Sequence, residues 1–533
     1  MTDTLEAGYD IRWAADQFRE RPAVVFRDRT YSFREVNGRA NRLANGLRAL
    51  GLQTGDRVGV LVNNSIHSVD AVFGLLKGGF CIVALNSRHA PPEHLGILTD
   101  AGCEAVIVAS PYSDMIQAVA ADAPALRHVI GIGWQPKTGL AYDAFLEGAS
   151  DKEPALEIPA DTISRLTYTS GTTGKPKGVV GTHRRHNARL ANFFQTCEYA
   201  LGPDQTMGQV GPLSHVAGNY LQPCFVRGAK TIIFERYDPT DLQAAIQEHR
   251  INHLLLVPTM IVRFVAALEP ERFDLSSLTR INYGTAPIPV DVLRRGIDIL
   301  GPVFRQHYGM SEANSPLTLL YPDEHLTEGP EDVVARLASC GRPIMAHRIV
   351  VRSADGVDLP AGEIGEICIK ALGAAAFEYW QRPDLTAEAI RDGWLYTGDL
   401  GRFDDDGYLF IVGRTKDMII TGGFNVYARE VEDALFAHEG VLEAAVIGLP
   451  DPDLGERIAA MVVLKPGVTL NETALQEHCR GQIAGYKVPR LWVLTDELPK
   501  TASAKVAKQV IREDLLARFG ADGAVTEVQA SYD

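Results

Sequence analysis

The sequence lacks the patterns that mark membrane-spanning, secreted and peroxisomal proteins. No run of residues approaches the ~18 consecutive apolar positions of a membrane-spanning helix. The opening residues, MTDTLEAGYD, contain no basic segment followed by an apolar stretch, so we predict no secretory signal. The closing residues, SYD, are not a peroxisomal tripeptide. We therefore expect a cytoplasmic protein with no membrane span.

Cysteine is scarce and never paired. The 533 residues include seven cysteines, an odd number, and no two of them are spaced as CxxC. They are Cys81, Cys103, Cys197, Cys224, Cys340, Cys368 and Cys479. This scatter suits a reducing compartment and gives no zinc-binding signature.

An excess of basic residues is also missing. Lysine and arginine number 52 against 67 aspartate and glutamate, a net charge of −15, which argues against a nucleic-acid partner. A short basic cluster, Arg184–His186, is interpreted as the solvated face of a helix. With 46% hydrophobic and 22% charged residues, the chain has the composition of a globular protein, and its length predicts two or more domains.

The first third of the chain alternates helices with short apolar strands. Apolar residues recur at helical spacing over 36–50, after a capping box formed by Ser32 and Glu35, and this predicts a helix that ends before Gly51. Strand signals lie at 57–62, 72–84, 104–109, 229–234 and 253–257. Repeated strand–helix–strand units indicate layered α/β architecture with largely parallel sheets.

The last third has a different pattern. From Gly356 to Gly413, glycines and aspartates separate short strands, which predicts a small β-rich subdomain. We therefore predict an α/β protein with a large N-terminal domain, residues 1–413, made of layered α/β sheets and this subdomain. A hinge at 414–417 follows, and then a small α+β C-terminal domain, residues 418–533.

The strongest chemical signal is the segment LTYTSGTTGKPKGVV at 166–180. An apolar strand runs into two hydroxyl-rich turns, three glycines and two lysines. Glycines let backbone N–H groups turn inward, while hydroxyls and ammonium groups add donors and charge, so the segment is suited to wrap a polyphosphate. It is not a Walker A loop, because only two residues separate Gly171 from Gly174 and Pro176 follows Lys175.

This segment resembles the signature of the adenylate-forming superfamily, which contains acyl- and aryl-CoA synthetases, luciferases and peptide-synthetase adenylation domains. Segments similar to the family's other motifs follow in order: GPLSHVAG (211–218), YGTAPIP (283–289), HYGMSEANS (307–315), TGDL (397–400), GRTKDMIITGGFNVYAREVE (413–432) and PKTASAKVAK (499–508). The resemblance spans residues 20 to 515. It implies activation of a carboxylic acid by ATP and Mg²⁺, and a mobile C-terminal domain.

The resemblance also implies the nucleotide site. The residues expected to bind ATP or AMP are Ser170, Gly171, Thr172, Thr173, Gly174, Lys175, Lys177, Gly284, Thr285, Ala286, Pro287, Tyr308, Gly309, Ser311, Asp399 and Arg414. Asp399 would accept both ribose hydroxyls, and Arg414 would contact the nucleotide at the domain junction. Tyr308 would form one wall of the adenine site, although packing in the core equally explains a lone tyrosine. Ser311 replaces the usual threonine and keeps its hydroxyl.

Four residues are expected to take part in catalysis: Thr169, His215, Glu312 and Lys505. Glu312 resembles the family's magnesium ligand, and a hard carboxylate oxygen suits that ion. Lys505 would bridge the attacking carboxylate and the α-phosphate, with Ala504 in place of the glycine that commonly precedes it. Taken alone, a lysine in such a polar stretch is more often solvated surface.

The resemblance places a pivot and a tunnel in the C-terminal part. Lys416 lies where the family turns its small domain between adenylating and thioester-forming arrangements. Gly422 and Gly423 would line the tunnel for the pantetheine of CoA, although a tight turn explains them equally well. Arg490 would meet CoA phosphates, or is a solvated cation.

The acid and the acceptor stay open at this point. The expected acyl pocket consists of His215, Val216, Ala217, Gly284 and Asn314, which implies apolar walls. His215 stands near the position where amino-acid-activating relatives carry an aspartate, so an amino-acid substrate is disfavoured. An aryl or a medium-chain aliphatic acid fits equally. CoA is the expected acceptor; a free amine, luciferase-like oxidation and a non-catalytic adenylate-binding protein are the alternatives. A homodimer also stays open.

Overall fold

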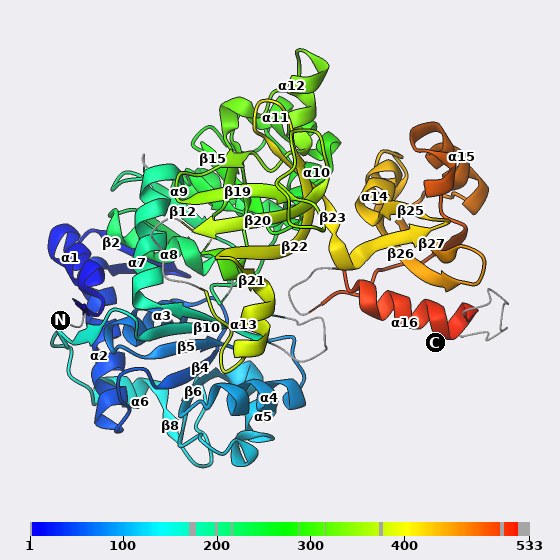
Figure 1. Ribbon diagram of the computed structural model, residues 1–533. Helices are drawn as coiled ribbons and strands as arrows, with labels where there is room; N and C mark the ends of the chain where they lie inside the picture. Colours follow the sequence, from blue (N-terminus) through cyan, green and yellow to red (C-terminus); the bar gives the residue numbers. More distant parts are fainter. Residues whose placement is uncertain are drawn as a thin grey trace.

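The computed structural model describes residues 3–169, 177–197, 201–214, 217–286, 288–314, 316–371, 377–501 and 506–520. Two parallel-dominated sheets form the body of the large domain (Figure 1). The first consists, in spatial order, of β11 (Lys177–Thr182), β10 (Ile163–Thr169), β5 (Cys81–Ala84), β4 (Arg57–Leu61), β6 (Ala105–Ala109), β7 (His128–Ile132) and β8 (Leu140–Ala141). Its strands pair in parallel except β10 with β11. The predicted parallel α/β pattern is therefore confirmed for this part of the chain.

The second sheet is also mostly parallel. It consists of β18 (Arg342–Pro343), β17 (Thr318–Leu320), β16 (Phe304–Tyr308), β15 (Arg280–Gly284), β14 (His253–Leu255), β12 (Thr206–Gln209), β13 (Lys230–Ile233), β2 (Pro22–Phe26) and β3 (Arg29–Ser32). A short antiparallel pair, β1 (Thr4–Glu6) with β9 (Glu157–Pro159), lies apart from both sheets. The carboxyl ends of β15 and β16 lie together at one edge of the second sheet, where ligands usually bind in open α/β sheets.

Helices pack on these sheets in the large domain. They are α1 (Tyr9–Phe18), α2 (Phe33–Ala49), α3 (Ile66–Lys77), α4 (Pro91–Ala101), α5 (Ser113–Gln117), α6 (Tyr142–Glu147), α7 (His183–Asn192), α8 (Gly218–Val226), α9 (Pro239–His249), α10 (Pro258–Ala266), α11 (Val290–Leu300), α12 (Glu331–Ala335) and α13 (Pro383–Ala389). None of the helices in the described ranges is both long enough and apolar enough to cross a bilayer.

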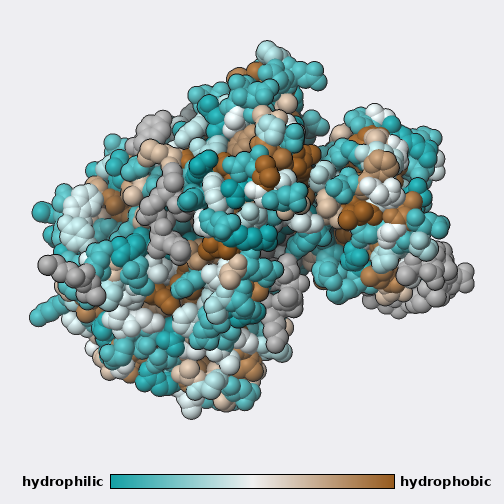
Figure 2. Space-filling model, in the orientation of Figure 1, coloured by the Kyte–Doolittle hydropathy of each residue, from teal (hydrophilic) through white to brown (hydrophobic). Residues whose placement is uncertain are grey.

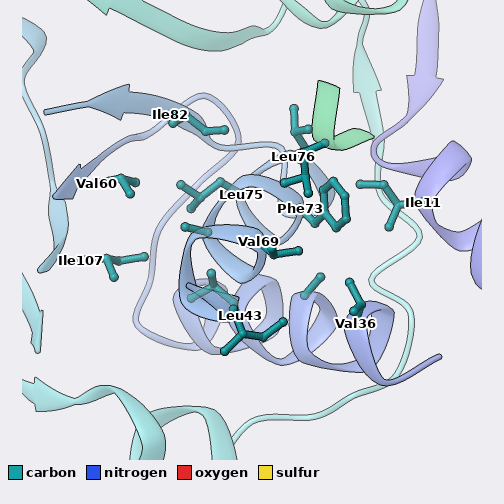
Figure 3. Close-up of a cluster of buried hydrophobic side chains, with 14 of the residues drawn as sticks. Ile11, Val36, Leu43, Val60, Val69, Phe73, Leu75, Leu76, Ile82 and Ile107 are labelled. Carbon is teal, nitrogen blue, oxygen red and sulfur yellow. The ribbon is translucent and has the colours of Figure 1, made fainter. Parts of the chain in front are cut away.

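Helix α2 shows how sequence pattern becomes packing. The Ser32 hydroxyl accepts the Glu35 N–H, and the Glu35 carboxylate accepts the Ser32 N–H, so the predicted capping box is present. Apolar residues of α2 and α3, among them Val36, Leu43 and Phe73, then pack against one another and against residues of β4, β5 and β6 (Figure 3). The cap and this contiguous core fix the two helices on the sheet.

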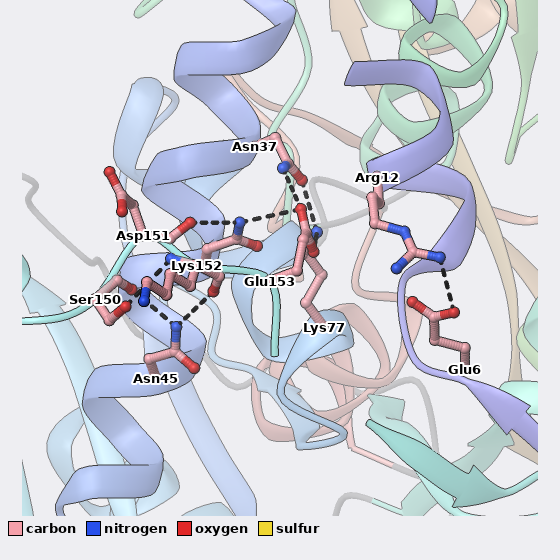
Figure 4. Close-up of polar contacts among 10 residues, drawn as sticks. Glu6, Arg12, Asn37, Asn45, Lys77, Ser150, Asp151, Lys152 and Glu153 are labelled. Carbon is pink, nitrogen blue, oxygen red and sulfur yellow. Dashed lines mark hydrogen bonds and ion pairs between the residues drawn. The ribbon is translucent and has the colours of Figure 1, made fainter. Parts of the chain in front are cut away.

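A buried lysine ties the same helices to a loop. Lys77, whose side chain is 1% exposed, donates to Asn37 Oδ1 at 2.6 Å and to Glu153 Oε2 at 2.7 Å (Figure 4). Asn45 of α2 donates to the carbonyls of Ser150 and Lys152, both at 2.8 Å. Because a buried ammonium group requires a charged or hydrogen-bonded partner, this network holds the segment 150–153 against α2.

The predicted β-rich subdomain is an antiparallel sheet. Its strands are β19 (His347–Arg352), β20 (Gly365–Ala371), β22 (Trp394–Phe403) and β21 (Ile390–Arg391), with β23 (Leu409–Arg414) paired to β22. A short 3₁₀ turn, η7 (Thr415–Asp417), then leads from β23 into the next sheet.

The C-terminal domain is a separate α+β unit. Its sheet contains β25 (Phe424–Tyr427), β24 (Met418–Thr421), β27 (Gly455–Leu464) and β26 (Val441–Asp451), with β28 (Leu491–Leu494) paired to β27. The helices α14 (Ala428–Phe436), α15 (Glu472–Gln482) and α16 (Lys508–Phe519) belong to it. This unit projects from the large domain, and a notch separates the two below their junction (Figures 1 and 2). The predicted fold class is confirmed.

Candidate active site

A β-hairpin holds the two ends of the glycine- and threonine-rich segment. Thr169 is the last residue of β10 and Lys177 the first of β11, and the two are paired in register. The intervening candidates lie outside the described residues: Ser170, Gly171, Thr172, Thr173, Gly174 and Lys175. Since the strands on either side are antiparallel partners, Thr169 and Lys177 lie side by side.

Glu312 lies close to this hairpin. It belongs to a 3₁₀ turn, η4 (Ser311–Ala313), which follows β16, and it is 9% exposed. Tyr379 Oη donates to Glu312 Oε1 at 3.1 Å, and the Nζ of Lys177 lies 5.4 Å from the centre of the Tyr379 ring. Burial, together with the Glu312 carboxylate, raises the pKa of Tyr379, so its hydroxyl stays protonated and can donate. No sequence motif had singled out Tyr379.

The surroundings of Glu312 fit a magnesium ion held mainly by phosphate. The described residues contain no group of three or more His, Cys, Asp or Glu side chains able to enclose a metal. Mg²⁺ in nucleotide sites is usually held by one or two carboxylates plus phosphate oxygens and water. A single buried carboxylate beside the phosphate-loop hairpin is compatible with that arrangement.

Asp399 has a partner at each carboxylate oxygen, one through a hydrogen bond and one through an ion pair. Tyr308 Oη donates to Oδ2 at 2.8 Å, and Arg414 Nε approaches Oδ1 at 2.9 Å. Asp399 on β22 and Arg414 on β23 are direct register partners, so the antiparallel pairing explains their contact. Burial raises the pKa of Tyr308, and the Asp399 carboxylate adds to the shift. Three expected nucleotide residues therefore form one contiguous group.

The turn after β15 has unusual backbone geometry. A Cβ on Gly284 would lie 2.1 Å from the His307 carbonyl oxygen, so any side chain there would clash with backbone. Thr285 has φ of 71°, in the left-handed region that β-branched residues rarely adopt. Ala286 follows, whereas Pro287 lies outside the described residues. Strained residues of this kind cluster at ligand sites, because only the surrounding structure can hold them in place.

A pocket opens between α7, α8 and the ends of β15 and β16. Its apolar wall includes Leu190, Phe193, Pro223 and Leu255, and its polar wall includes His186, Arg189, Asn219, Tyr220, Gln222 and His307. Gly284, Thr285, Tyr308 and Gly309 complete the lining on the strand side. The strand-side residues are expected nucleotide or acyl contacts, while sequence reasoning missed the residues from α7 and α8.

The remaining acyl-pocket candidates lie elsewhere or outside the described residues. Ala217 is buried in a cluster with Phe193 and Tyr220, which line the pocket, but is not itself among the lining residues. The Asn314 amide donates to the Arg185 carbonyl at 3.0 Å. His215 and Val216 lie outside the described residues.

The interpretation of the basic cluster as a solvated face is wrong for two of its three residues. Arg184 does pair at the surface with Asp3 and Asp161. Arg185 is buried and donates to the carbonyls of Val180 and Glu312, both at 2.9 Å. His186 lines the pocket. Successive helical positions point about 100° apart, so three adjacent residues of α7 cannot all face solvent on a helix packed against the core.

The C-terminal candidates are spread over the hinge and the small domain, and the structure gives a local explanation for the two glycines. Lys416 lies within η7. Gly422 and Gly423 have φ of 56° and 82° in the turn between β24 and β25, and at Gly423 a Cβ would have no neighbour within 4 Å. Their left-handed conformation, rather than crowding, favours glycine in this arrangement. Arg490 is exposed next to β28, and Lys505 lies outside the described residues.

Comparisons with known proteins match nearly the whole chain. The AMP-binding enzyme model matches residues 11–380, and the model of its C-terminal domain matches residues 430–505. Feruloyl-CoA synthase of Amycolatopsis sp is 35% identical over 95% of this chain and 98% of its own. The medium/long-chain-fatty-acid–CoA ligase FadD8 of Mycobacterium tuberculosis is 33% identical over 95% of this chain and 89% of its own.

Solved structures agree with this result. The anthranilate CoA ligase AuaEII in complex with anthranoyl-AMP has a TM-score of 0.86 at 27% identity, covering 96% of this chain and 97% of its own. The amide bond synthetase McbA from Marinactinospora thermotolerans has a TM-score of 0.85 at 27% identity, covering 95% of this chain and 99% of its own. The chain therefore belongs to the AMP-binding enzyme family, in the acyl- and aryl-CoA synthetase branch of the adenylate-forming superfamily, and is an AMP-forming acid–thiol ligase.

Proposed function

We propose that the protein activates an aryl or medium-chain aliphatic acid with ATP and transfers the acyl group to CoA. The acid carboxylate would attack the α-phosphorus of ATP, giving acyl-AMP and pyrophosphate, and the CoA sulfur would then displace AMP. The segment 308–312 supports this proposal most directly. It presents Tyr308 to Asp399 and Glu312 to Tyr379, so a candidate ribose site and a candidate phosphate site occur at the two ends of one short segment.

Each half of the nucleotide would have its own contacts. Asp399 would accept the ribose hydroxyls, with Tyr308 and the strained turn at Gly284–Ala286 against the adenine. Lys177, Thr169 and the 170–175 segment would surround the phosphates. Glu312 would hold magnesium, which when bound neutralises phosphate charge. Fixed hydrogen-bond donors and cations, placed where negative charge develops in the transition state, are the usual source of rate enhancement in phosphoryl chemistry.

The two chemical steps would use two domain arrangements. Residues 1–413 would bind acid and ATP, and residues 418–533 would bring Lys505 to the reacting carboxylate. Rotation about Lys416 in the 414–417 hinge would then present Gly422 and Gly423 to the pantetheine, with Arg490 near the CoA phosphates. A short turn between two sheets is the kind of element that absorbs such a rotation.

Amide formation is the second candidate function. The fold match to the amide bond synthetase McbA, with a TM-score of 0.85, is the observation that favours it. Such an enzyme would form the same acyl-AMP but pass it to a free amine instead of CoA.

Mass spectrometry of products separates the two functions. The full-length protein would be incubated with ATP, magnesium and a panel of aryl and aliphatic acids, with CoA, with amines, and with neither. We expect acyl-CoA only in the CoA arm. An amide without any thioester would replace the ligase proposal with the amide-forming one, and absence of adenylate with every acid would overturn both.

The Lys505→Ala variant tests the division into half-reactions. We expect acid-dependent pyrophosphate release to fall by roughly 100-fold or more, because the carboxylate loses its charged partner in the transition state. Thioester formation from supplied acyl-AMP should change by less than about 3-fold. The exposed Lys465→Ala serves as the control. Equal loss in both half-reactions would contradict alternation between two domain arrangements.

A further inference from the structure

An arginine without an acidic partner lines the pocket. Arg189 lies on α7 and faces the cavity beside Leu190, Phe193 and Leu255. Among the described residues that line this cavity there is no aspartate or glutamate, and no ion pair in the described ranges involves Arg189. A buried guanidinium without a counter-charge is costly unless polar groups or a ligand pair with it. A ligand that enters the pocket can supply the missing charge.

The guanidinium is held in place by neutral groups. Arg189 Nη1 donates to Asn219 Oδ1 at 2.5 Å, and Nη2 lies 3.3 Å from His186 Nδ1. Because a guanidinium can only donate, His186 Nδ1 is the acceptor, so the ring hydrogen is on Nε2 and is donated to Gln222 Oε1. Gln222 in turn donates to Asp10 of α1. This chain orients Arg189 and leaves most of its five N–H donors for a ligand.

The local charge is positive on this side of the pocket. Burial lowers the pKa of Arg189 to about 9, with the charges of Arg165 and Arg185 adding to the shift, so the side chain remains protonated at neutral pH. Burial keeps the pKa of His186 and His307 well below the usual value, so both rings are neutral. Arg189 is therefore the charged side chain that this wall of the pocket presents to a ligand.

Resting on the proposed function, we propose that Arg189 binds a second carboxylate of the acid substrate. The acid would lie with its reacting carboxyl toward the Gly284–Thr285 and Tyr308–Gly309 side, where the nucleotide is expected. Its other end would reach α7, where the planar fork of Arg189 matches a carboxylate in a two-point contact. The enzyme would thus select acids with an anionic far end over simple fatty or aryl acids.

A charge series at constant chain length tests this inference. Hexanoate, adipate and the ω-amino acid with the same number of carbons carry a neutral, an anionic and a cationic group at the far end, and chains from succinate to suberate scan the distance. For the wild type we expect kcat/KM for pyrophosphate release to favour the best diacid over its monoacid by roughly 10- to 100-fold. The ω-amino acid should be the poorest of the three.

The variants assign the preference to one side chain. Arg189→Met should abolish the preference by lowering only the diacid rates, and Arg189→Lys should retain part of it. Arg184→Met, on the same helix but at the surface, should leave it unchanged. As a readout independent of turnover, adipate should raise the thermal midpoint of the wild type and of R184M but not that of R189M.

Three results would overturn the inference. The wild type could convert monoacids as well as diacids. R189M could lower both classes equally, which would place Arg189 at the reacting carboxyl or in a structural role. A phenolic acid could give a higher kcat/KM than every diacid, which would mean that Arg189 binds a neutral hydrogen-bond acceptor instead of a second carboxylate. Each of these leaves acid activation intact, whereas no adenylate from any acid would overturn the proposed function itself.

Discussion

At the scale of single residues, Tyr379 connects two groups of opposite charge. Its ring lies beside the Lys177 ammonium and its hydroxyl donates to Glu312. A cation over an aromatic face and a hydrogen bond to a carboxylate each contribute modestly, but together they fix where the lysine and the glutamate stand. Tyr379 is therefore a positioning residue for the proposed phosphate site.

Tyr379→Phe keeps the ring and removes only the hydrogen bond to Glu312. Without that donor the Glu312 carboxylate is less well oriented, so the magnesium concentration for half-maximal pyrophosphate release should rise roughly 3- to 10-fold. KM for the acid should stay unchanged. A magnesium titration at saturating ATP measures this shift.

Tyr112→Phe is the matched control, because Tyr112 donates to Asn63 in another part of the large domain. Its magnesium dependence should equal that of the wild type. If Tyr379→Phe lowered kcat at every magnesium concentration and left the half-saturating value in place, the hydroxyl would act on something other than the metal ligand.

At the scale of elements, α2 depends on its capping box. Ser32→Ala leaves the Glu35 N–H without its side-chain acceptor, and loss of such a cap costs about 1 kcal/mol. In urea unfolding followed by circular dichroism, the free energy of unfolding of the first transition should fall by that amount. The transition should therefore move to lower urea with its slope unchanged. The cap should matter here because α2 forms part of the core with α3.

Glu35→Gln provides the comparison. Glutamine retains an oxygen that can accept the Ser32 N–H, so the reciprocal cap survives. The exposed pairing of Glu35 with Arg29 at 3.6 Å contributes little. We expect a change of no more than about 0.5 kcal/mol. A loss as large as that of S32A would show that charge, rather than capping, stabilises this end of α2.

Local patterns predicted the elements well because the physics involved is local. The box at Ser32 and Glu35 and the apolar spacing after it are properties of neighbouring residues, and the strand predicted at 57–62 contains β4, Arg57–Leu61. The adenylate-forming motifs likewise predicted that Tyr308 and Asp399 belong to one site, and the two are in contact.

Contacts between distant segments could not be predicted in this way. Tyr379 reaches Glu312 from 67 positions away, and Arg189 meets Asn219 across 30. The burial of Arg185 depends on carbonyl acceptors at Val180 and Glu312 that only the folded chain brings together. The sequence shows only that three basic residues are adjacent, whereas the packing of α7 decides which of them face the pocket.

At the scale of the whole molecule, buried histidines should make stability depend on pH. Burial lowers the pKa of His94, His183, His325 and His347 from 6.5 to about 4. Below pH 6.5 the unfolded chain therefore binds more protons than the folded one, and stability falls as pH falls toward 4. Each histidine contributes about 1.4 kcal/mol per pH unit within that window.

Thermal melts from about pH 7.5 to about pH 5 should show a midpoint that drops below pH 6.5, before most carboxylates titrate. His347→Phe should reduce the slope, because neither ring nitrogen of His347 has a partner among the described residues and an apolar ring can replace it. A midpoint that stays constant down to about pH 5.5 would contradict the prediction.

The contact between Asp399 and Arg414 couples ligand occupancy to the domain junction. Arg414 is the last residue of β23 and directly precedes the turn into the C-terminal domain. If ribose hydroxyls take the Asp399 oxygens, they compete with this ion pair. By thermodynamic reciprocity, a domain orientation in which Arg414 leaves Asp399 but keeps its expected contact with the nucleotide would bind nucleotide more tightly, and bound nucleotide would favour that orientation by the same free energy. One side chain would thus let the small domain sense whether the site is filled.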